Sequence, residues 1–452
     1  MVSDPDRVAE ARLALRGGDK EAAFRAITAA LQHPHSLEDA RLSGAFQLYA
    51  EIARTFADPA TAEKLRAAAA DFASVGALYE AAQALFLQHQ FGVAATLLHR
   101  AQRLQPGQPA IVAELVANLH ALLCYAEAQA VLASSGLCEG DPLLSYLLGF
   151  SALMSGDLVA ARGVMPSLAA LSGPSAAARD ALAGMLARAD ALSGAIAPPG
   201  GSSVSDRVDL GDHALTAWHA VIQGTMLCHE SPHGYGTPMR GRYAFVQDSP
   251  DLMRQGIARL KRLLERAERS PARVVAAPDR ASLILALAVG QSLELPVVPW
   301  APGQEQSGLV TAWNLSAITE LSFLEALAEH YPEQILFSHA SSWVDPFSFA
   351  PDVTTLLYQE ITNPFVGGAL SVDPETKQIQ VAPPRAEDDG VLAEEILAAP
   401  IRDPSVTTVA HLFSVLDPLL KLPPEQRVGL GRREGRRLLA HRGSPVQSNR
   451  FS

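Results

Sequence analysis

The stretch FGVAATLLHRAQRLQP, from Phe91 to Pro106, has the apolar spacing of an amphipathic helix and ends at a proline, which cannot continue one. Its small residue Ala94 has counterparts further along the chain, Ala128 in CYAEAQAVLASSG and Ala161 in DLVAARGVMPSLAAL. The steps between these alanines are 34 and 33 residues. Such a period is long enough for two short helices, so the spacing predicts a stack of helical hairpins.

An earlier copy of the pattern surrounds Ala22, 72 residues before the first of these alanines, so the interval has room for one divergent repeat with a short insertion. The pattern resembles that of tetratricopeptide (TPR) repeats, with Phe91 in the large aromatic position. The resemblance is best over residues 75–171 and weakest over 36–72. It implies an α-solenoid, and such arrays bind other proteins more often than they catalyse reactions.

In a TPR stack the first helix of each pair lines the concave surface, where ligands usually lie. Alignment with the repeat places six candidate contact residues there: Tyr79, Gln83, Phe86, His120, Tyr146 and Phe150. The alternative is that half of these side chains pack against the next repeat. Chaperone-binding TPRs hold a terminal carboxylate with Lys and Asn, whereas the equivalent positions here are mostly Ala, Leu or aromatic. The resemblance therefore implies a protein partner that presents an apolar or amphipathic helix.

The composition is that of a folded protein with more than one domain: 452 residues, 48% hydrophobic and 19% charged. The net charge of -12 argues against nucleic-acid binding. The N-terminal segment lacks the apolar region of a signal peptide, and the most apolar run, 282–290, is too short to cross a bilayer. We therefore expect a cytoplasmic protein without a membrane contact. Separately, the excess of arginine over lysine, 31 against 5, suggests a GC-rich bacterial genome.

The domain organisation follows from a stretch rich in Pro, Gly and Ser, 193–206, which predicts a flexible linker. It would separate a TPR-like domain, 1–192, from an α/β domain, 207–425. Residues 426–452 are basic and predict a partly disordered tail. In that tail, one stripe of a short solvated helix would carry Arg432, Arg433, Arg436 and Arg437.

Beyond the linker, strand-like segments alternate with helix-like ones. The expected strands are 242–248, 273–278, 296–300, 308–315 and 334–340, and the expected helices are 214–227, 249–269, 280–295 and 318–331. This alternation predicts an α/β layer with a mostly parallel sheet. The segments 367–373 and 378–384 flank PETK and predict a hairpin.

The order of elements over 273–340 resembles the core of a type I phosphoribosyltransferase. That family ends one strand in two acidic residues and a Thr-Gly turn, which bind the ribose phosphate. Here the matching strand is 309–313, neither acidic residue follows it, and Glu320 replaces the glycine of the turn. The resemblance therefore implies a degenerate site. No dinucleotide or P-loop motif follows any strand, so we expect no cofactor.

Open α/β sheets bind ligands at the carboxyl ends of their strands. This rule selects Asp279, Arg280, Asn314 and Ser316 as possible ligand contacts. Asp279 also has a simpler interpretation, as the N-cap of the helix that follows it.

The segment MLCHESPHGYG offers an alternative site. Cys228, His229 and His233 supply thiolate and imidazole groups that suit zinc. A loop between domains with solvated histidines is the favoured interpretation.

Two functions from different classes stay open. In the first, the protein is a non-enzymatic adaptor or scaffold with a structural or ligand-sensing α/β module. In the second, the α/β domain is an enzyme acting on a small or nucleotide-like substrate, and the repeats recruit or regulate. The first is favoured because no complete catalytic set stands where the topology would place one.

Overall fold

A computed structural model describes residues 3–169, 171–196, 214–233, 239–303, 307–331, 333–345, 347–373, 378–401, 406–431, 435–446 and 448. The chain divides into two compact units, Met1–Arg179 and Asp180–Ser452. The boundaries at 192, 206 and 425 stay predictions, and most of the predicted linker lies outside the described residues.

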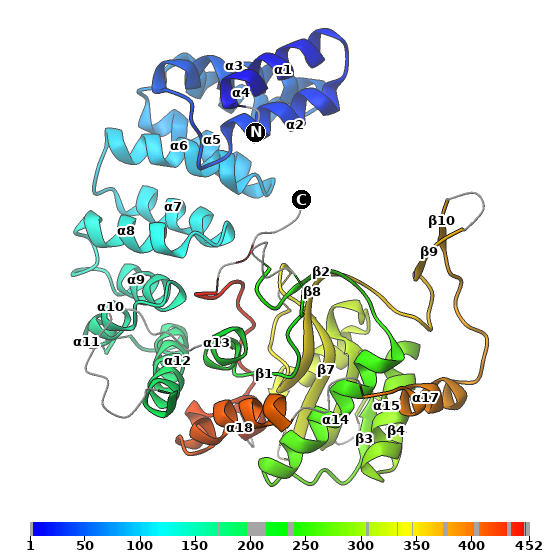
Figure 1. Ribbon diagram of the computed structural model, residues 1–452. Helices are drawn as coiled ribbons and strands as arrows, with labels where there is room; N and C mark the ends of the chain where they lie inside the picture. Colours follow the sequence, from blue (N-terminus) through cyan, green and yellow to red (C-terminus); the bar gives the residue numbers. More distant parts are fainter. Residues whose placement is uncertain are drawn as a thin grey trace. The chain divides into compact units, whose positions relative to one another are not determined.

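The N-terminal unit is a TPR-like array of helical hairpins (Figure 1). Its helices are α1 (Asp4–Arg16), α2 (Lys20–Leu31), α3 (Asp39–Thr55), α4 (Pro59–Ala70), α5 (Val75–Leu87), α6 (Phe91–Leu104), α7 (Pro109–Ala121), α8 (Tyr125–Ser135), α9 (Pro142–Met154), α10 (Leu158–Gly163), α11 (Met165–Leu168) and α12 (Pro174–Ile196), the last running across the unit boundary. From α1 to α10, each odd-numbered helix packs against the next even-numbered one. The first helices α5, α7 and α9 begin 34 and 33 residues apart, which confirms the period expected from the alanines.

The hairpin turns repeat one backbone feature: a residue with positive φ lies two positions before the second helix of each pair. These residues are Gly18, Ala57, His89, Leu123 and Gly156, with φ between 58° and 85°. In four of the turns the next amide donates to the carbonyl five residues earlier, as Cys124 does to Leu119 at 2.8 Å. The weakly matching segment 36–72 therefore forms the same hairpin as its neighbours.

The alanines of the repeat lie where helices meet. Ala94, Ala128 and Ala161 are fully buried, whereas Ala22 is half-buried and its neighbour Ala23 is fully buried. A small side chain at these points lets two helix backbones approach closely, and the surrounding leucines fill the space between pairs. One core runs through the array as a result.

The C-terminal unit is built on a parallel sheet, as expected. Its strands are β1 (Met226–Leu227), β2 (Tyr243–Gln247), β3 (Val274–Ala276), β4 (Val297–Pro299), β5 (Gly308–Asn314), β7 (Gln334–Ser342) and β8 (Val353–Thr362). The order across the sheet is β1-β8-β7-β5-β3-β4, and β2 also pairs with β8. Every one of these pairings is parallel.

Helices cover both faces of this sheet. They are α13 (Ala214–Gln223), α14 (Pro250–Arg266), α15 (Arg280–Leu293), α16 (Leu321–Leu327), α17 (Asp389–Ala398) and α18 (Val406–Leu420). Helix α15 packs on β3 and β5, and α14 packs on β8. Phe323 and Leu327 of α16 pack with Val310 and Leu336 of the strands. Strand β8 and helices α17 and α18 were not among the expected elements, and α13 ends before residue 227 because Gly224 takes a positive φ and β1 follows.

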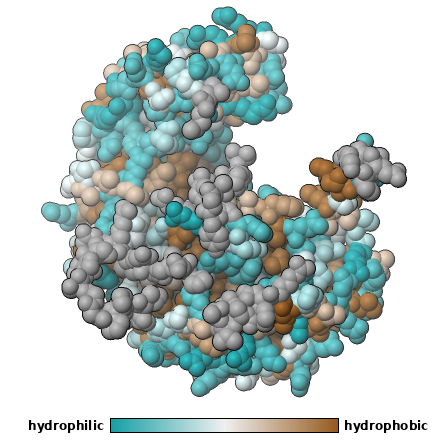
Figure 2. All heavy atoms as spheres, viewed as in Figure 1, coloured by the Kyte–Doolittle hydropathy of each residue, from teal (hydrophilic) through white to brown (hydrophobic). Residues whose placement is uncertain are grey.

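The predicted hairpin is confirmed: β9 (Leu370–Val372) and β10 (Ile379–Val381) pair antiparallel, and the PETK turn lies outside the described residues. Its cross-strand pairs, Leu370 with Val381 and Val372 with Ile379, put four apolar side chains on one face. These side chains are 40% to 71% exposed, and the hairpin stands out as a brown patch in Figure 2.

The expectation of a solvated helical tail is wrong for the residues that are described. Gly429–Gly431 is a short 3-10 turn, and β11 (Gly435–Arg436) pairs antiparallel with β6 (Glu329–His330). Arg437 is buried against Asp352. Strand pairing and this ion pair hold the segment in the fold. Arg432 and Arg433 lie outside the described residues.

Among the helices of the described part of the chain, none is both long enough and apolar enough to cross a membrane.

Candidate functional site

The first helices of the array carry the predicted contact residues. On α5, the Nε2 atom of Gln83 donates to the Tyr79 hydroxyl at 3.0 Å, and Gln83 itself is exposed. Phe86 is half-buried and packs edge-on against Phe91 of α6, with ring centroids 5.3 Å apart. This part of the surface therefore presents the polar edge of Tyr79 and Gln83 beside the partly covered ring of Phe86.

The remaining predicted residues belong to an aromatic cluster that joins α7, α8 and α9. The ring of Phe150 lies 5.7 Å from His120, 6.0 Å from Tyr125 and 6.1 Å from Tyr146. The Nε2 atom of His120 is 2.8 Å from the Ser151 hydroxyl. Burial lowers the pKa of His120 to about 4, so its ring is neutral near pH 7.

Phe150 does not have the exposure expected of a contact residue, because only 8% of it reaches solvent. It packs against Tyr125 and so belongs to the core that joins successive repeats. His120 and Tyr146 are half-buried. Their roles in partner binding, like those of the other predicted contacts, stay predictions.

Two exposed leucines on the same helices were missed. Leu87 is 79% exposed and follows Gln83 by one turn of α5. Leu143 is 60% exposed and precedes Tyr146 by three residues on α9. Spacings of three and four residues place side chains on one helix face, so the helical pattern of the sequence could have identified both leucines as surface candidates.

Charge is almost absent from the three central first helices. Helices α5, α7 and α9 contain no Lys or Arg, and their acidic residues are Glu80 and Glu114. Burial raises the pKa of Glu114. This surface offers no cation to pair with a partner's carboxylate.

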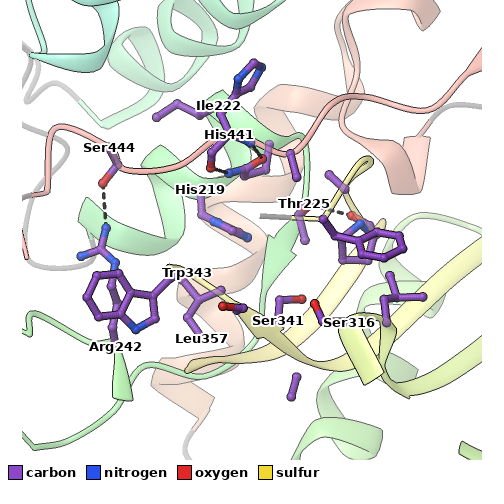
Figure 3. A pocket seen from close by; sticks show the side chains of 18 of the residues that line it. His219, Ile222, Thr225, Arg242, Ser316, Ser341, Trp343, Leu357, His441 and Ser444 are labelled. Carbon is purple, nitrogen blue, oxygen red and sulfur yellow. Dashed lines mark hydrogen bonds between the residues drawn. The ribbon is translucent and has the colours of Figure 1, made fainter. Parts of the chain in front are cut away.

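The α/β unit has a pocket at the carboxyl ends of β5 and β7 (Figure 3). Helix α13 supplies one wall through His219 and Ile222. Aromatic side chains supply another through Trp343, Phe347 and Phe349. The last strip of wall comes from residues 440–444, near the end of the chain. The lining is thus mainly apolar with a few polar groups, as is usual for small-molecule sites.

Arg242 is the charged residue of this lining. It is 4% exposed, its Nη2 atom donates to the Ser444 hydroxyl at 2.9 Å, and its guanidinium lies 5.6 Å from the Trp343 ring centroid. Figure 3 shows Arg242 and Trp343 side by side at one end of the pocket, with Ser316 at the other. The Nη1 atom is buried and has no hydrogen-bond partner among the described residues. Burial lowers the pKa of Arg242 to about 10, against the opposing charge of Glu230, so the group stays cationic at neutral pH.

Two histidines of the pocket are held neutral. Burial, together with the charge of Arg242, lowers the pKa of His219 to about 3. Burial and the charge of Arg188 lower that of His441 to about 4. The His441 backbone amide donates to the side chain of Gln223 at 2.8 Å, which ties the end of the chain to α13. At neutral pH the pocket therefore combines one cation with uncharged imidazoles.

No protein-family model matches the chain, and no curated protein matches it. Among solved structures it is similar to pilF of Pseudomonas aeruginosa, with 20% identity over 41% of this chain and 84% of that one and a TM-score of 0.25. It is also similar to a thermophilic TPR protein of Thermus thermophilus, with 18% identity over 40% of this chain and 97% of that one and a TM-score of 0.23.

The four predicted ligand residues separate into two groups. Asn314 and Ser316 line the pocket, where Asn314 donates to the Tyr358 hydroxyl at 2.7 Å. Asp279 caps α15 by accepting from the Ser282 amide at 2.9 Å. Arg280 forms an ion pair with Asp389 at 2.8 Å and donates to the carbonyl of Arg385, so it fastens α17. As ligand contacts, all four stay predictions.

Cys228, His229 and His233, the alternative zinc ligands, lie in one segment of the α/β unit, and a metal-binding role for them stays a prediction. These residues line a separate open groove, but their ligand atoms do not converge within 4.8 Å as a group. Cys228 is buried next to β8, and burial raises the pKa of its thiol to about 12. The His229 ring is 2.9 Å from the Tyr243 hydroxyl instead. The backbone of Cys228 and His229 bonds to β8, so this segment extends the sheet edge and is not a free loop.

Proposed function

We propose that this protein is a protein-interaction scaffold, and that the first helices of its TPR-like array bind an apolar or amphipathic helix of a protein partner. The observation that carries the proposal is the exposure of Leu87 and Leu143 on helices without a single cation. Burying an exposed leucine against a partner is worth about 1.5 to 3 kcal/mol. Tyr79, Gln83, Phe86 and Tyr146 supply the surrounding aromatic and polar contacts.

The kind of partner follows from the same chemistry. A carboxylate or acidic motif needs Lys or Arg to hold it, and α5, α7 and α9 supply neither. An amphipathic helix needs apolar anchors at three- and four-residue spacing, and the exposed leucines suit it. A cytoplasmic location, a bacterial origin and the lack of a nucleic-acid partner stay predictions.

Affinity capture with the full-length chain tests this proposal. The variant Leu87→Ser/Leu143→Ser should recover at least about tenfold less of a specific partner from an extract of the source cells, because two apolar anchors are lost. The matched control is Val159→Ser, which changes a residue 50% exposed on the second helix α10. Identical partners at identical yield from wild type and the double variant would overturn the proposal.

For the α/β unit we propose a ligand-sensing role: its pocket binds a small anion with a flat apolar body. The observation that favours it is Arg242, a buried cation with a donor that no described residue satisfies. Leaving such a donor unpaired costs free energy that an anionic ligand would recover. Trp343, Phe347 and Phe349 suit the apolar part, and Asn314 and Ser316 suit its polar edge.

Thermal unfolding of the full-length chain tests the ligand proposal. All four tryptophans, Trp218, Trp300, Trp313 and Trp343, lie in the α/β unit, so their fluorescence follows that unit alone. Aryl carboxylates, aryl phosphates and nucleoside monophosphates should raise the midpoint more than inorganic phosphate does, and Arg242→Met should abolish the rise. A rise that persists in the variant, or none with any compound, would contradict the proposal. Turnover of a compound would support an enzyme instead.

A further inference from the structure

The strongest unassigned group of metal-ligating side chains lies in the N-terminal array. His33 follows α2, His99 is on α6 and Glu127 is on α8. The His33 Nε2 atom is 2.8 Å from Glu127 Oε2, and the His99 Nε2 atom is 3.0 Å from Glu127 Oε1. One ligand atom from each residue lies within 4.8 Å of the other two. No other group of His, Cys, Asp and Glu in the described part of the chain converges in this way.

The fold positions these side chains through one face of α6. Gly92, Thr96 and His99 follow each other at helical spacing on that face. The Gly92 carbonyl accepts from the His33 amide at 3.0 Å, and the Thr96 hydroxyl donates to the Leu31 carbonyl at 2.7 Å. A Cβ on Gly92 would collide with the side chain of Gln32. The segment that carries His33 is therefore seated on the helix that carries His99.

The contact between His99 and Glu127 is not an ordinary hydrogen bond. The His99 Nε2 atom is buried and makes no hydrogen bond with any described residue, although a carboxylate oxygen is only 3.0 Å away. The rings of His33 and His99 lie 4.6 Å apart, with 31° between their planes. His33 Nε2, in contrast, is within hydrogen-bond distance of Glu127 Oε2. Both Nε2 atoms therefore approach the two oxygens of one carboxylate, which brings three possible ligand atoms together.

We propose that His33, His99 and Glu127 bind a divalent transition-metal ion of the Zn²⁺ type. Two imidazole nitrogens and a carboxylate oxygen are a known zinc ligand set, and imidazole favours zinc over magnesium or calcium, which prefer oxygen. Three protein ligands leave a fourth position for water.

Such an ion would connect three parts of the array. Its ligands come from the segment after α2 and from α6 and α8, which belong to three different hairpins. All three lie on second helices or just beyond one, whereas the proposed partner contacts lie on first helices. The metal would therefore hold these three hairpins in one arrangement without occupying the partner surface, and the inference stands apart from the proposed function.

Calorimetric titration of ZnSO₄ into the metal-free full-length chain, without a histidine tag, tests the site. The replacements His99→Gln and Glu127→Gln should each weaken one high-affinity binding event at least about tenfold, since loss of a ligand costs more than loss of a supporting residue. The control is His89→Asn, because His89 has positive φ, which Asn tolerates. Co²⁺ in place of Zn²⁺ should show d–d absorption bands that both ligand variants lose.

Circular dichroism in EDTA checks that each variant is folded, and His33→Gln, in the segment after α2, replaces any variant that is not. Unchanged Zn²⁺ isotherms in the folded ligand variants would overturn the proposal. Equal weakening in His89→Asn would overturn it as well, as would Mg²⁺ binding as tightly as Zn²⁺.

Discussion

Arg437 and Asp352 form an ion pair inside the α/β unit: Nη1 lies 3.0 Å from Oδ1, and the two side chains are 1% and 4% exposed. The second guanidinium nitrogen, Nη2, donates to the side-chain oxygen of Gln334 at 2.6 Å, and the Leu336 amide donates to Asp352 at 2.7 Å. Burial alone would raise the pKa of Asp352. The charge of Arg437, together with the nearby His330 ring and the Leu336 amide, outweighs burial and holds the pKa well below its usual range. The end of the chain is thereby fixed to β7 and to the start of β8.

Replacing Arg437 by Met should destabilise the α/β unit by about 3 to 5 kcal/mol, because the buried carboxylate of Asp352 is left without its partner. Urea unfolding followed by tryptophan fluorescence measures the effect in the full-length chain, since every tryptophan lies in this unit. The control Arg262→Met removes an ion pair with Glu265 in which both side chains are about half exposed, and should change little. An equal unfolding midpoint in Arg437→Met and wild type would contradict the prediction.

The burial of Arg437 illustrates what sequence patterns leave out. Its partner Asp352 lies 85 residues earlier in the chain, and no local period connects the two. Strand β8 was missed for a related reason. The described residues between β7 and β8 form no helix, so the strand does not follow the alternation of strands and helices that located its neighbours. The array was predictable because its contacts join residues one repeat apart.

Only some residues of the candidate sites could be predicted from the sequence, for the same reason. Asn314 and Ser316 could be selected because the carboxyl end of a parallel strand is a place defined by sequence order. Arg242 could not be selected, since it precedes β2 and meets the pocket only through tertiary folding. His33 and His99 are likewise 66 residues apart and converge only because α6 seats the segment after α2.

Acid should destabilise the α/β unit through His219. The pKa of this ring is about 3 in the folded chain and about 6.5 in an unfolded one, so the unfolded state binds the extra proton between those values. Stability is fully present above about pH 6.5 and is lost as the pH falls towards 3, by at most about 1.4 kcal/mol per pH unit for one histidine. Urea midpoints measured by tryptophan fluorescence from pH 7 to 4 should fall less steeply in His219→Gln. Parallel slopes would show that His219 does not titrate in this way.

Gly256 of α14 should resist replacement although glycine weakens a helix. A Cβ there would lie no more than 3.1 Å from three side-chain atoms of Thr355 on β8, and Thr355 is fully buried and branched at Cβ. Overpacking of this kind costs about 1 to 3 kcal/mol, more than the gain of up to about 1 kcal/mol in helix propensity. Gly256→Ala should therefore lower the urea midpoint of the tryptophan signal.

Gly44→Ala in α3, where a Cβ meets nothing within 4 Å, should instead stabilise its own unit. Stabilisation by both changes would contradict the packing argument.

We predict opposite effects on stability for two substitutions in the hairpin turns of the array. Ala57 and Gly18 hold the same position, two residues before a second helix, and both have positive φ, 58° and 82°. A left-handed backbone costs an alanine about 1 to 2 kcal/mol, whereas glycine adopts it freely but loses about 0.5 to 1 kcal/mol more entropy on folding. Ala57→Gly should therefore stabilise the array by about 0.5 to 1 kcal/mol, and Gly18→Ala should destabilise it by a similar amount. A Cβ on Gly18 meets nothing within 4 Å, so only backbone conformation changes there. The stability of the array in both variants is measured by unfolding followed with far-ultraviolet circular dichroism. The contribution of the α/β unit is subtracted by means of its own transition, which tryptophan fluorescence follows. Two shifts of the same sign would mean that the turns do not share this backbone requirement.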